Sequence, residues 1–308
     1  MVAIAGSLMM AELLMYAYTA RPQCDPAMYY PRIPALEELK QLPSGRILGV
    51  SCLPPALNLM LRLPDIRGYD AVDPKRLLDV LEFARQGGTS SLPYARTQEF
   101  IPWGAWNEGS LHVSPVLNML NVRYLIFCED LPNPVKAIIR RDGYTVVEND
   151  LAMARTFVPQ TVQDVDNEQQ LMDQLRTVRF DPMRVSYVTE HLDLPAVSRG
   201  TARILEESPE RVVVDARMDT AGMVVLADLW DKGWQAQVDG HVAPILLVNH
   251  AIRGVVLPAG QHKIVFRYVP ASVRIGWIMS GTGVAFGLGW AAWIMRWRRK
   301  ARRTEHVS

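Results

Sequence analysis

The chain has 308 residues, of which 33 are basic and 32 acidic, and six of the basic residues lie within the last 13. The remaining body is mildly acidic, with 27 basic and 31 acidic residues, which argues against a nucleic-acid partner. A chain of this length can bury a sizeable core, and we expect two globular domains beside any membrane spans.

The first segment, residues 1–20, is apolar except for one carboxylate at Glu12. It has no basic stretch ahead of its apolar residues, which favours a transmembrane helix over a secretory signal peptide. We expect this helix to enter from the cytoplasm, which would place Glu12 near the middle of the bilayer. A carboxylate at that depth normally faces other helices or a wet cavity, so Glu12 is a helix-packing candidate. The alternative is a shallow segment whose Glu12 reaches the headgroups.

A proline-rich connector follows over residues 21–34, and it contains the first of three cysteines. Cys24, Cys52 and Cys128 lack the spacing of a metal site, and an odd number excludes a complete disulfide framework. A bridge between Cys24 and Cys52 is possible outside the cytosol. The alternative is that all three cysteines are small buried hydrophobic residues.

Helical and strand patterns alternate over residues 35–198, which predicts a mixed α/β domain. Helical spacing occurs over residues 35–42, 74–85 and 116–121, and strand-like runs occur over residues 46–52, 122–128, 144–148, 154–158 and 185–189. Asp164 and Asp166 precede a further expected helix. Capping of that helix is favoured over a metal-binding D-x-D motif, because acidic residues stabilise the positive end of a helix.

From residue 199 to residue 270 the pattern changes to strands alone. Seven short strands are expected, with tight hairpin turns at Asp239-Gly240 and at Pro258-Ala259-Gly260. An antiparallel β-sandwich is the most economical architecture for such a series. The predicted fold is therefore a membrane-anchored α+β chain, in which a mixed α/β domain and a β-sandwich lie outside the cytoplasm between two transmembrane helices.

The second of these helices is predicted over residues 274–295, where an apolar stretch without charge begins at Ile275. The basic tail, residues 296–308, places the C-terminus in the cytoplasm and the body outside. Small residues line one face of this helix and let another helix approach closely, unless they reflect only the general frequency of glycine in spans. These helix-packing candidates are Gly276, Ser280, Gly283 and Gly287, followed by Ala291.

No catalytic residue, cofactor site or metal site is predicted. The six histidines are dispersed without the spacing of a zinc site, and the body has no nucleophile elbow and no phosphate-binding glycine loop. Trp103 and Trp106 are possible glycan-stacking residues. The alternative is that their loop folds onto the core.

Several stretches of the chain are familiar as an ordered set. They are AELLMYAY (residues 11–18), PAMYYPRIPALEELK (26–40), DIRGYDAVDPKR (65–76), LNMLNVRYLI (117–126) and the run from GWQAQVDG to FRYVPAS (233–272). Together they resemble the C-terminal part of the YfhO-like bacterial membrane proteins. The resemblance implies a relationship to GT-C glycosyltransferases, which use polyprenyl-phosphate-linked sugars outside the cytoplasmic membrane. It also implies that the catalytic acidic residue belongs to an N-terminal half that this sequence does not contain.

Three functional hypotheses follow. The first is the extracytoplasmic and C-terminal portion of a YfhO-like polytopic protein of the bacterial cytoplasmic membrane, accessory to sugar transfer onto envelope polymers. Its expected partners are membrane lipid, other transmembrane helices and a polyprenyl-linked sugar or envelope glycan. The second is a standalone membrane-anchored module that binds a glycan or a protein and has no enzymatic activity. The third treats the first span as an uncleaved signal anchor on a structural module.

Overall fold

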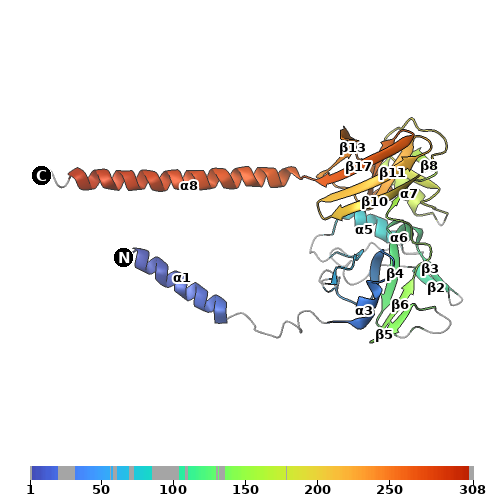
Figure 1. Cartoon of the computed structure of the whole chain (residues 1–308), viewed down its shortest axis with the longest axis horizontal. Helices are drawn as coiled ribbons and strands as arrows, with labels where there is room; N and C mark the ends of the chain where they lie inside the picture. Colours follow the sequence, from blue (N-terminus) through green and yellow to red (C-terminus); the bar gives the residue numbers. More distant parts are fainter. Residues whose placement is uncertain are drawn as a thin grey trace.

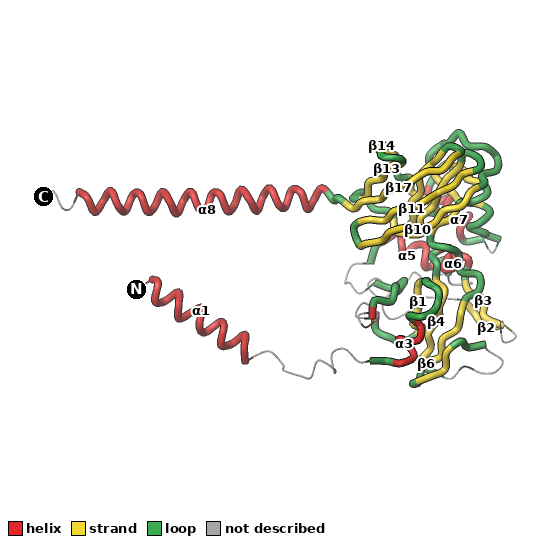
Figure 2. The backbone as a smooth tube through the Cα atoms, in the orientation of Figure 1, coloured by secondary structure: helices red, strands yellow, loops and turns green. Residues whose placement is uncertain are grey.

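The computed structural model describes residues 2–19, 32–55, 57, 61–68, 73–84, 104–107, 110–129, 131, 136–177 and 179–304. Two helices, α1 (Val2–Thr19) and α8 (Ala271–Thr304), extend from a globular body toward the same side (Figure 1). The remaining described elements build the body, in which strands predominate (Figure 2).

A four-stranded sheet with helices on both faces forms the first part of the body. Its strand order is β1 (Arg46–Val50), β4 (Val122–Phe127), β6 (Tyr144–Glu148) and β5 (Ile139–Arg141). The β1 and β4 strands are parallel, and the other neighbours are antiparallel. This unit confirms the prediction of a mixed helix and strand architecture.

Adjacent residues of these strands point to opposite faces, and each face has its own helices. Ile47 and Ile126 pack with α3 (Pro34–Leu39) in one buried cluster. Leu48 and Leu125 pack with α5 (Lys75–Glu82) and α6 (Pro115–Met119) in another. The strands are therefore apolar on both sides, which explains their continuous hydrophobic runs in the sequence.

Two smaller strand pairs are separate from this sheet. The hairpin of β2 (Gly104–Asn107) and β3 (Ser110–Val113) is one, and the parallel pair β8 (Thr161–Asp164) and β9 (Val185–Val188), joined through α7 (Glu168–Leu175), is the other. The predicted capping of α7 by acidic residues is wrong. Asn167 is the N-cap and accepts a 2.9 Å hydrogen bond from the Gln170 backbone N–H, whereas Asp164 ends β8 and contacts His191.

Two antiparallel sheets form the second part of the body. The five-stranded sheet has the order β10 (Gly200–Ser208), β11 (Arg211–Met218), β17 (Gly260–Tyr268), β13 (Trp234–Val238) and β14 (His241–Ala243). The four-stranded sheet has the order β15 (Leu246–Val248), β16 (Ile252–Leu257), β12 (Gly222–Leu229) and β7 (Thr156–Phe157). Residues 199–270 thus contain eight strands rather than the seven predicted, because β14 is separate from β15.

Side chains from both sheets share one buried cluster. Val212 and Phe266 of the larger sheet meet Val224 and Val255 of the smaller sheet there. The opposite face of the smaller sheet, including Val225, joins the cluster that also contains α5 and α6. The sheet of β15, β16, β12 and β7 is therefore covered on both faces, and it connects the two parts of the body.

One of the two predicted hairpin turns is confirmed. Asp239 and Gly240 have φ values of 52° and 85° and join Val238 to its pairing partner His241, which fits a two-residue turn with positive φ. The second prediction is wrong, since the segment Pro258-Ala259-Gly260 connects β16 to β17. These strands belong to different sheets, so the turn passes from one sheet to the other.

Candidate functional site

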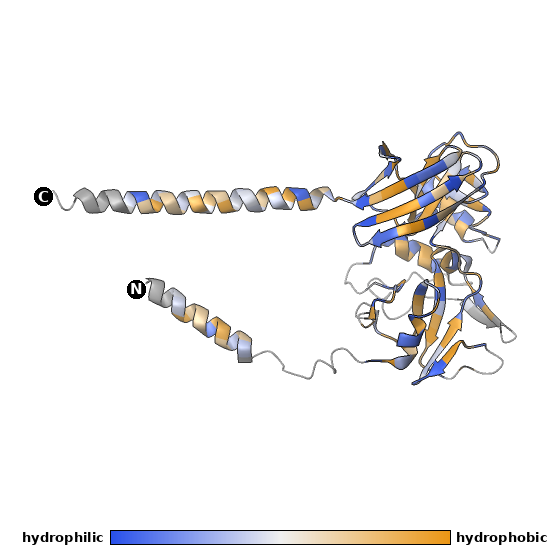
Figure 3. Cartoon of the chain, in the orientation of Figure 1, coloured by the Kyte–Doolittle hydropathy of each residue, from blue (hydrophilic) through white to orange (hydrophobic). Residues whose placement is uncertain are grey.

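The α8 helix leaves the body directly after the last strand. Its stretch Ala271–Trp297 has 27 residues, none of them buried, and in the fully described part of the chain it is the one helix long and apolar enough to cross a membrane. At about 1.5 Å per residue this stretch is about 40 Å long, which exceeds a hydrocarbon core of about 30 Å. Apolar residues follow one another along most of the helix (Figure 3). The stretch contains the span predicted over residues 274–295.

A pocket of about 640 Å³ lies on the larger sheet at β13 and β14. This volume is in the range of about 300–1,000 Å³ that is typical of small-molecule sites. The lining combines two indoles, two amides, three charged side chains and aliphatic side chains. The residues are Trp230, Asp231, Lys232, Trp234, Gln235, Ala236, Gln237, Val242, Ala243, Ile245, Val265 and Arg267.

The pocket is next to the start of α8. Trp234 pairs with Tyr268, the last residue of β17. The Val269 backbone N–H then donates a 2.7 Å hydrogen bond to the Gly233 carbonyl oxygen. Because α8 begins only two residues later, at Ala271, the edge of the pocket lies within roughly 10 Å of the helix start.

Gly233 is closely packed in the turn that precedes β13. The Gly233 backbone N–H donates a 2.7 Å hydrogen bond to Asp231 Oδ1. A Cβ atom on Gly233 would lie 2.6 Å from Tyr268 Cε2 and 2.9 Å from Asp231 Oδ1, so any other residue would displace the tyrosine ring. Partial burial and the nearby Asp231 carboxylate raise the pKa of the Tyr268 hydroxyl.

Trp234 has a fixed orientation in the pocket wall. The Arg253 guanidinium lies 3.8 Å from the centre of its ring, in a cation–π contact, and the Tyr268 ring centre is 5.2 Å away. The exposed amides of Gln235 and Gln237 line the same pocket from the other face of β13, since they alternate with Trp234 along the strand. An arrangement of flat aromatic surfaces and polar groups suits the binding of a polar ring.

Comparison with known proteins finds a family that this region resembles. Residues 212–280 match the family model described as bacterial membrane protein YfhO. This segment is therefore YfhO-like. The match confirms the resemblance inferred from the sequence, and searches of the curated proteins and of the solved structures found no match.

The YfhO-like segment contains the complete pocket lining and the beginning of α8. Three of the predicted helix-packing candidates in α8 have open space around them. A methyl group on Gly276, Gly283 or Gly287 would meet no atom within 4 Å, and Ser280 is exposed as well. This small-residue face is uncovered, and its packing against another helix remains a prediction.

Two predicted sites lie apart from the YfhO-like segment. Glu12 is exposed on α1, on a side that also carries Met9, Leu13 and Tyr16; the membrane crossing of α1 remains a prediction. Trp103 and the Trp106 side chain lie outside the described residues, although the backbone of Trp106 belongs to β2. Their stacking on a glycan therefore also remains a prediction.

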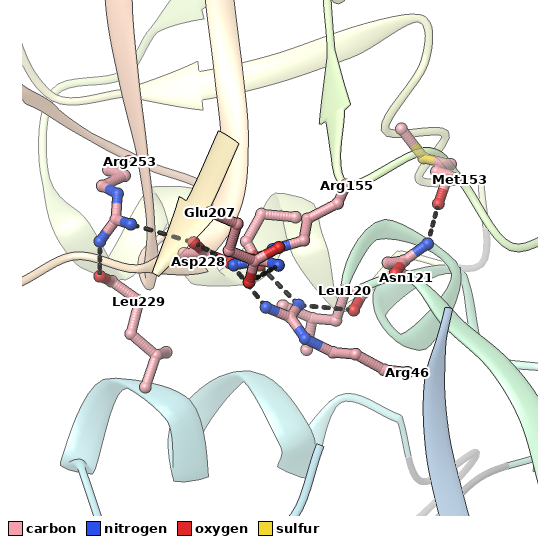
Figure 4. A network of polar contacts seen from close by, with 10 residues as sticks. Arg46, Leu120, Asn121, Met153, Arg155, Glu207, Asp228, Leu229 and Arg253 are labelled. Carbon is pink, nitrogen blue, oxygen red and sulfur yellow. Dashed lines mark hydrogen bonds and ion pairs between the residues drawn. The ribbon is translucent and has the colours of Figure 1, made fainter. Parts of the chain in front are cut away.

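A cluster of three arginines surrounds Asp228 (Figure 4), and one of them, Arg253, contacts the pocket residue Trp234. Asp228 Oδ1 accepts hydrogen bonds from Arg46 Nη2 at 2.6 Å and from Arg155 Nε at 2.7 Å. Asp228 Oδ2 accepts from Arg155 Nη2 at 2.8 Å and from Arg253 Nη2 at 3.0 Å. Arg155 also pairs with Glu207, and Arg253 is the residue that covers Trp234. The cluster thus positions one wall of the pocket.

Burial and charge act in opposite directions within the cluster. Burial would raise the pKa of Asp228, but the Arg155 hydrogen bond and the charges of the three arginines lower it to about 2. Burial lowers the pKa of Arg253 to about 10, and it also lowers the pKa of Arg46 although Asp228 opposes the shift. Asp228 and its arginine partners are charged at neutral pH. The cluster therefore has a structural role, as a set of ion pairs, and does not supply an acid or base for catalysis.

The same cluster joins the two parts of the body. Arg46 lies on β1 of the first sheet, and its Nη1 donates to the Leu120 carbonyl oxygen at 2.8 Å and to the Ala227 carbonyl oxygen on β12 at 2.6 Å. Sequence reasoning missed these residues because Arg46 and Asp228 are 182 positions apart. The available signal was an acidic residue in the apolar run of β12, since a lone charge in a buried strand needs a partner.

Proposed function

We propose that the chain is the extracytoplasmic and C-terminal portion of a YfhO-like polytopic membrane protein. In this proposal it holds a saccharide for sugar transfer at the outer surface of the cytoplasmic membrane. The pocket beside the start of α8 carries this proposal. It combines Trp230 and Trp234 with amide and charged side chains, and it lies entirely within the YfhO-like segment.

The lining of the pocket fits the chemistry of a sugar ring. A pyranose has apolar C–H faces, which aromatic side chains cover well, and a rim of hydroxyl groups. The amides of Gln235 and Gln237 can donate and accept hydrogen bonds, and Asp231, Lys232 and Arg267 add charged partners. We expect the bound saccharide to be part of an envelope polymer or of a polyprenyl-linked sugar.

The position of the pocket fits a membrane-bound reaction. In this proposal α8 crosses the bacterial cytoplasmic membrane, the basic tail from Arg296 onward lies in the cytoplasm, and the body lies outside. The paired sheets then act as the predicted β-sandwich, which α8 holds at the lipid surface. Catalysis belongs to other transmembrane helices of the same system, against which Glu12 and the small-residue face of α8 pack.

Saccharide binding tests the proposal. The whole chain in detergent is titrated with hexose, N-acetylhexosamine and polyol-phosphate oligosaccharides, and binding is followed by calorimetry and tryptophan fluorescence. We expect saturable binding to at least one of them, and we expect Trp230→Ala to weaken it at least tenfold, equivalent to about 1.4 kcal/mol. Gln261→Ala, on the same sheet but outside the pocket, is the matched control. Binding that Trp230→Ala leaves unchanged, or no binding at all, would contradict the proposal.

The second candidate is an anchored module that binds a protein instead of a glycan. It draws on Val242, an apolar side chain at the pocket that is 86% exposed. Such a residue suits an apolar protein contact better than a sugar hydroxyl. A protein partner lost on Val242→Asp and kept on Trp230→Ala would favour this alternative.

A further inference from the structure

Cys52 and Cys128 lie at the ends of two adjacent strands. The β1 strand ends at Val50, which pairs with Phe127 at the end of the parallel strand β4. Cys128 follows Phe127 directly, and Cys52 follows Val50 after one residue. The two strand ends that precede the cysteines are about 4.8 Å apart, and a disulfide bridges Cα separations of about 4.4–6.8 Å.

The chain turns back after β1 and brings Cys52 toward β4. Ser51 and Leu53 have φ values of 51° and 61°, and a Cβ atom on Gly49 would lie only 2.4 Å from the Cys52 carbonyl oxygen. The Cys52 Sγ atom lies 3.4 Å from the Ile126 carbonyl oxygen on β4. Burial, together with the neighbouring Cys128 thiol, raises the pKa of the Cys52 thiol.

A buried ion pair holds this turn in place. Arg67 Nη1 donates to the Cys52 carbonyl oxygen at 3.1 Å, and Arg67 Nη2 donates to the Leu53 carbonyl oxygen at 2.6 Å. The same guanidinium pairs with Asp65 at 2.8 Å, and both side chains are almost fully buried. The Cys52 thiol is therefore fixed beside Cys128 by groups that cannot easily move.

We propose that Cys52 and Cys128 are a dithiol pair that oxidises to an intramolecular disulfide. The bond ties the carboxyl ends of β1 and β4 together in the first part of the body. The pairing differs from the Cys24–Cys52 bridge considered from the sequence, and Cys24 lies outside the described residues. Both cysteines are free thiols in the structure, so the bond is a modification of the fold that already exists.

The exposure of the two thiols sets the order of the reaction. Cys128 is exposed, whereas Cys52 is half-buried and its burial raises the pKa of its thiol. The Cys128 thiolate attacks a disulfide of a low-molecular-weight or protein oxidant, which releases one oxidant thiolate. The Cys52 thiolate then attacks the Cys128 sulfur and releases the second. Two electrons and two protons pass to the oxidant, which leaves as a dithiol or as two thiols.

Peptide mapping of the whole chain in detergent tests the pair. The Cys24→Ser variant is incubated with oxidised glutathione, free thiols are alkylated, and the chain is digested without reduction. We expect a linked pair of peptides containing Cys52 and Cys128, and no alkylated cysteine until a reductant is added. The variants with Cys52→Ser or Cys128→Ser in the same background should each keep one accessible thiol or its glutathione adduct.

Two results would overturn the inference. One is full alkylation of Cys52 and Cys128 in the oxidised Cys24→Ser variant, and the other is a bridge from Cys24 to Cys52 in the unmodified chain. The unmodified chain needs no substitution to be mapped, so a folding defect in a variant cannot hide the answer. The glutathione buffer supplies the oxidant, and the test therefore stands independently of saccharide binding and of membrane topology.

Discussion

Asp228 is a largely buried carboxylate that forms ion pairs with three arginines. Its carboxylate receives guanidinium groups from Arg46, Arg155 and Arg253, which come from three separate strands or strand ends. A buried ion pair adds little net stability compared with apolar packing, but removal of one partner leaves uncompensated charge. Asp228 is therefore expected to matter through the three arginines that it neutralises.

The substitution Asp228→Asn should destabilise the body strongly. We expect a loss of about 3–5 kcal/mol in the free energy of unfolding, because three arginines lose their shared counter-ion. Asp215→Asn is the matched control, since Asp215 pairs with an Arg203 side chain that is 75% exposed, and its loss should cost less than about 1 kcal/mol. Urea unfolding of both variants in detergent measures the difference. Equal losses would contradict the account.

The stability that Asp228 contributes should depend on pH in the acid range. Its pKa is about 2 in the folded chain against an ordinary 3.8, so the folded state prefers the ionised form. This contribution is complete above pH 4 and is lost as the pH falls toward 2, and it amounts to about 2 kcal/mol. Unfolding measured at pH 5 and pH 2 should show a smaller acid loss in Asp228→Asn than in the unmodified chain. The same loss in both would show that Asp228 is not the group responsible.

Residue-level prediction succeeded only where a signal is local. The Asp239-Gly240 turn was identified because its backbone angles depend on two adjacent residues. The arginine cluster and the pocket depend on contacts between strands that are far apart in sequence, so no spacing rule reveals them. The tryptophans singled out from the sequence were Trp103 and Trp106, whereas the pocket contains Trp230 and Trp234.

At the scale of elements, the feature of interest in α8 is a face of small residues. Its small residues Gly276, Ser280, Gly283 and Gly287 recur at spacings of three and four, so they lie along one face. That face has open space around its glycines. A second helix could approach it closely in the membrane.

Enlarging this face should weaken the association of α8 with a neighbouring helix. We expect Gly283→Leu and Gly287→Leu each to reduce co-purification of a co-expressed YfhO-like transmembrane partner several-fold, because the added side chains keep the backbones apart. Ala285→Leu, on the opposite face, is the control and should retain the partner. Retention by all three variants would mean that helix packing uses another surface.

Strand positions were predicted well and strand partners poorly. The strand-like runs at residues 122–128 and 144–148 correspond to β4 and β6, because both are continuous apolar segments bounded by polar residues. The pairing of β7 with β12 was not foreseen. The strand-like run over residues 154–158 contains β7, but its partner lies about seventy positions away, and no local pattern identifies a partner at that distance.

At the scale of the whole molecule, one layer connects everything else. The four-stranded sheet with β12 at its centre packs against the larger sheet on one face and against α5 and α6 on the other. The Asp228 cluster lies near the end of β12 in this layer, and the pocket lies where the larger sheet leads into α8. Arg46, Asp228 and Arg253 form a continuous series of contacts from the first part of the body to the pocket residue Trp234.

The central claim is that this body stands on the outer side of the membrane, with the tail after α8 in the cytoplasm. Single cysteines placed at Gln261 and at Ser308, in a chain whose own three cysteines are serine, test it directly. Intact spheroplasts are treated with a maleimide that cannot cross the membrane. The account predicts labelling at position 261 without lysis and at position 308 only after lysis. Labelling at position 308 in intact spheroplasts, with position 261 protected, would contradict it.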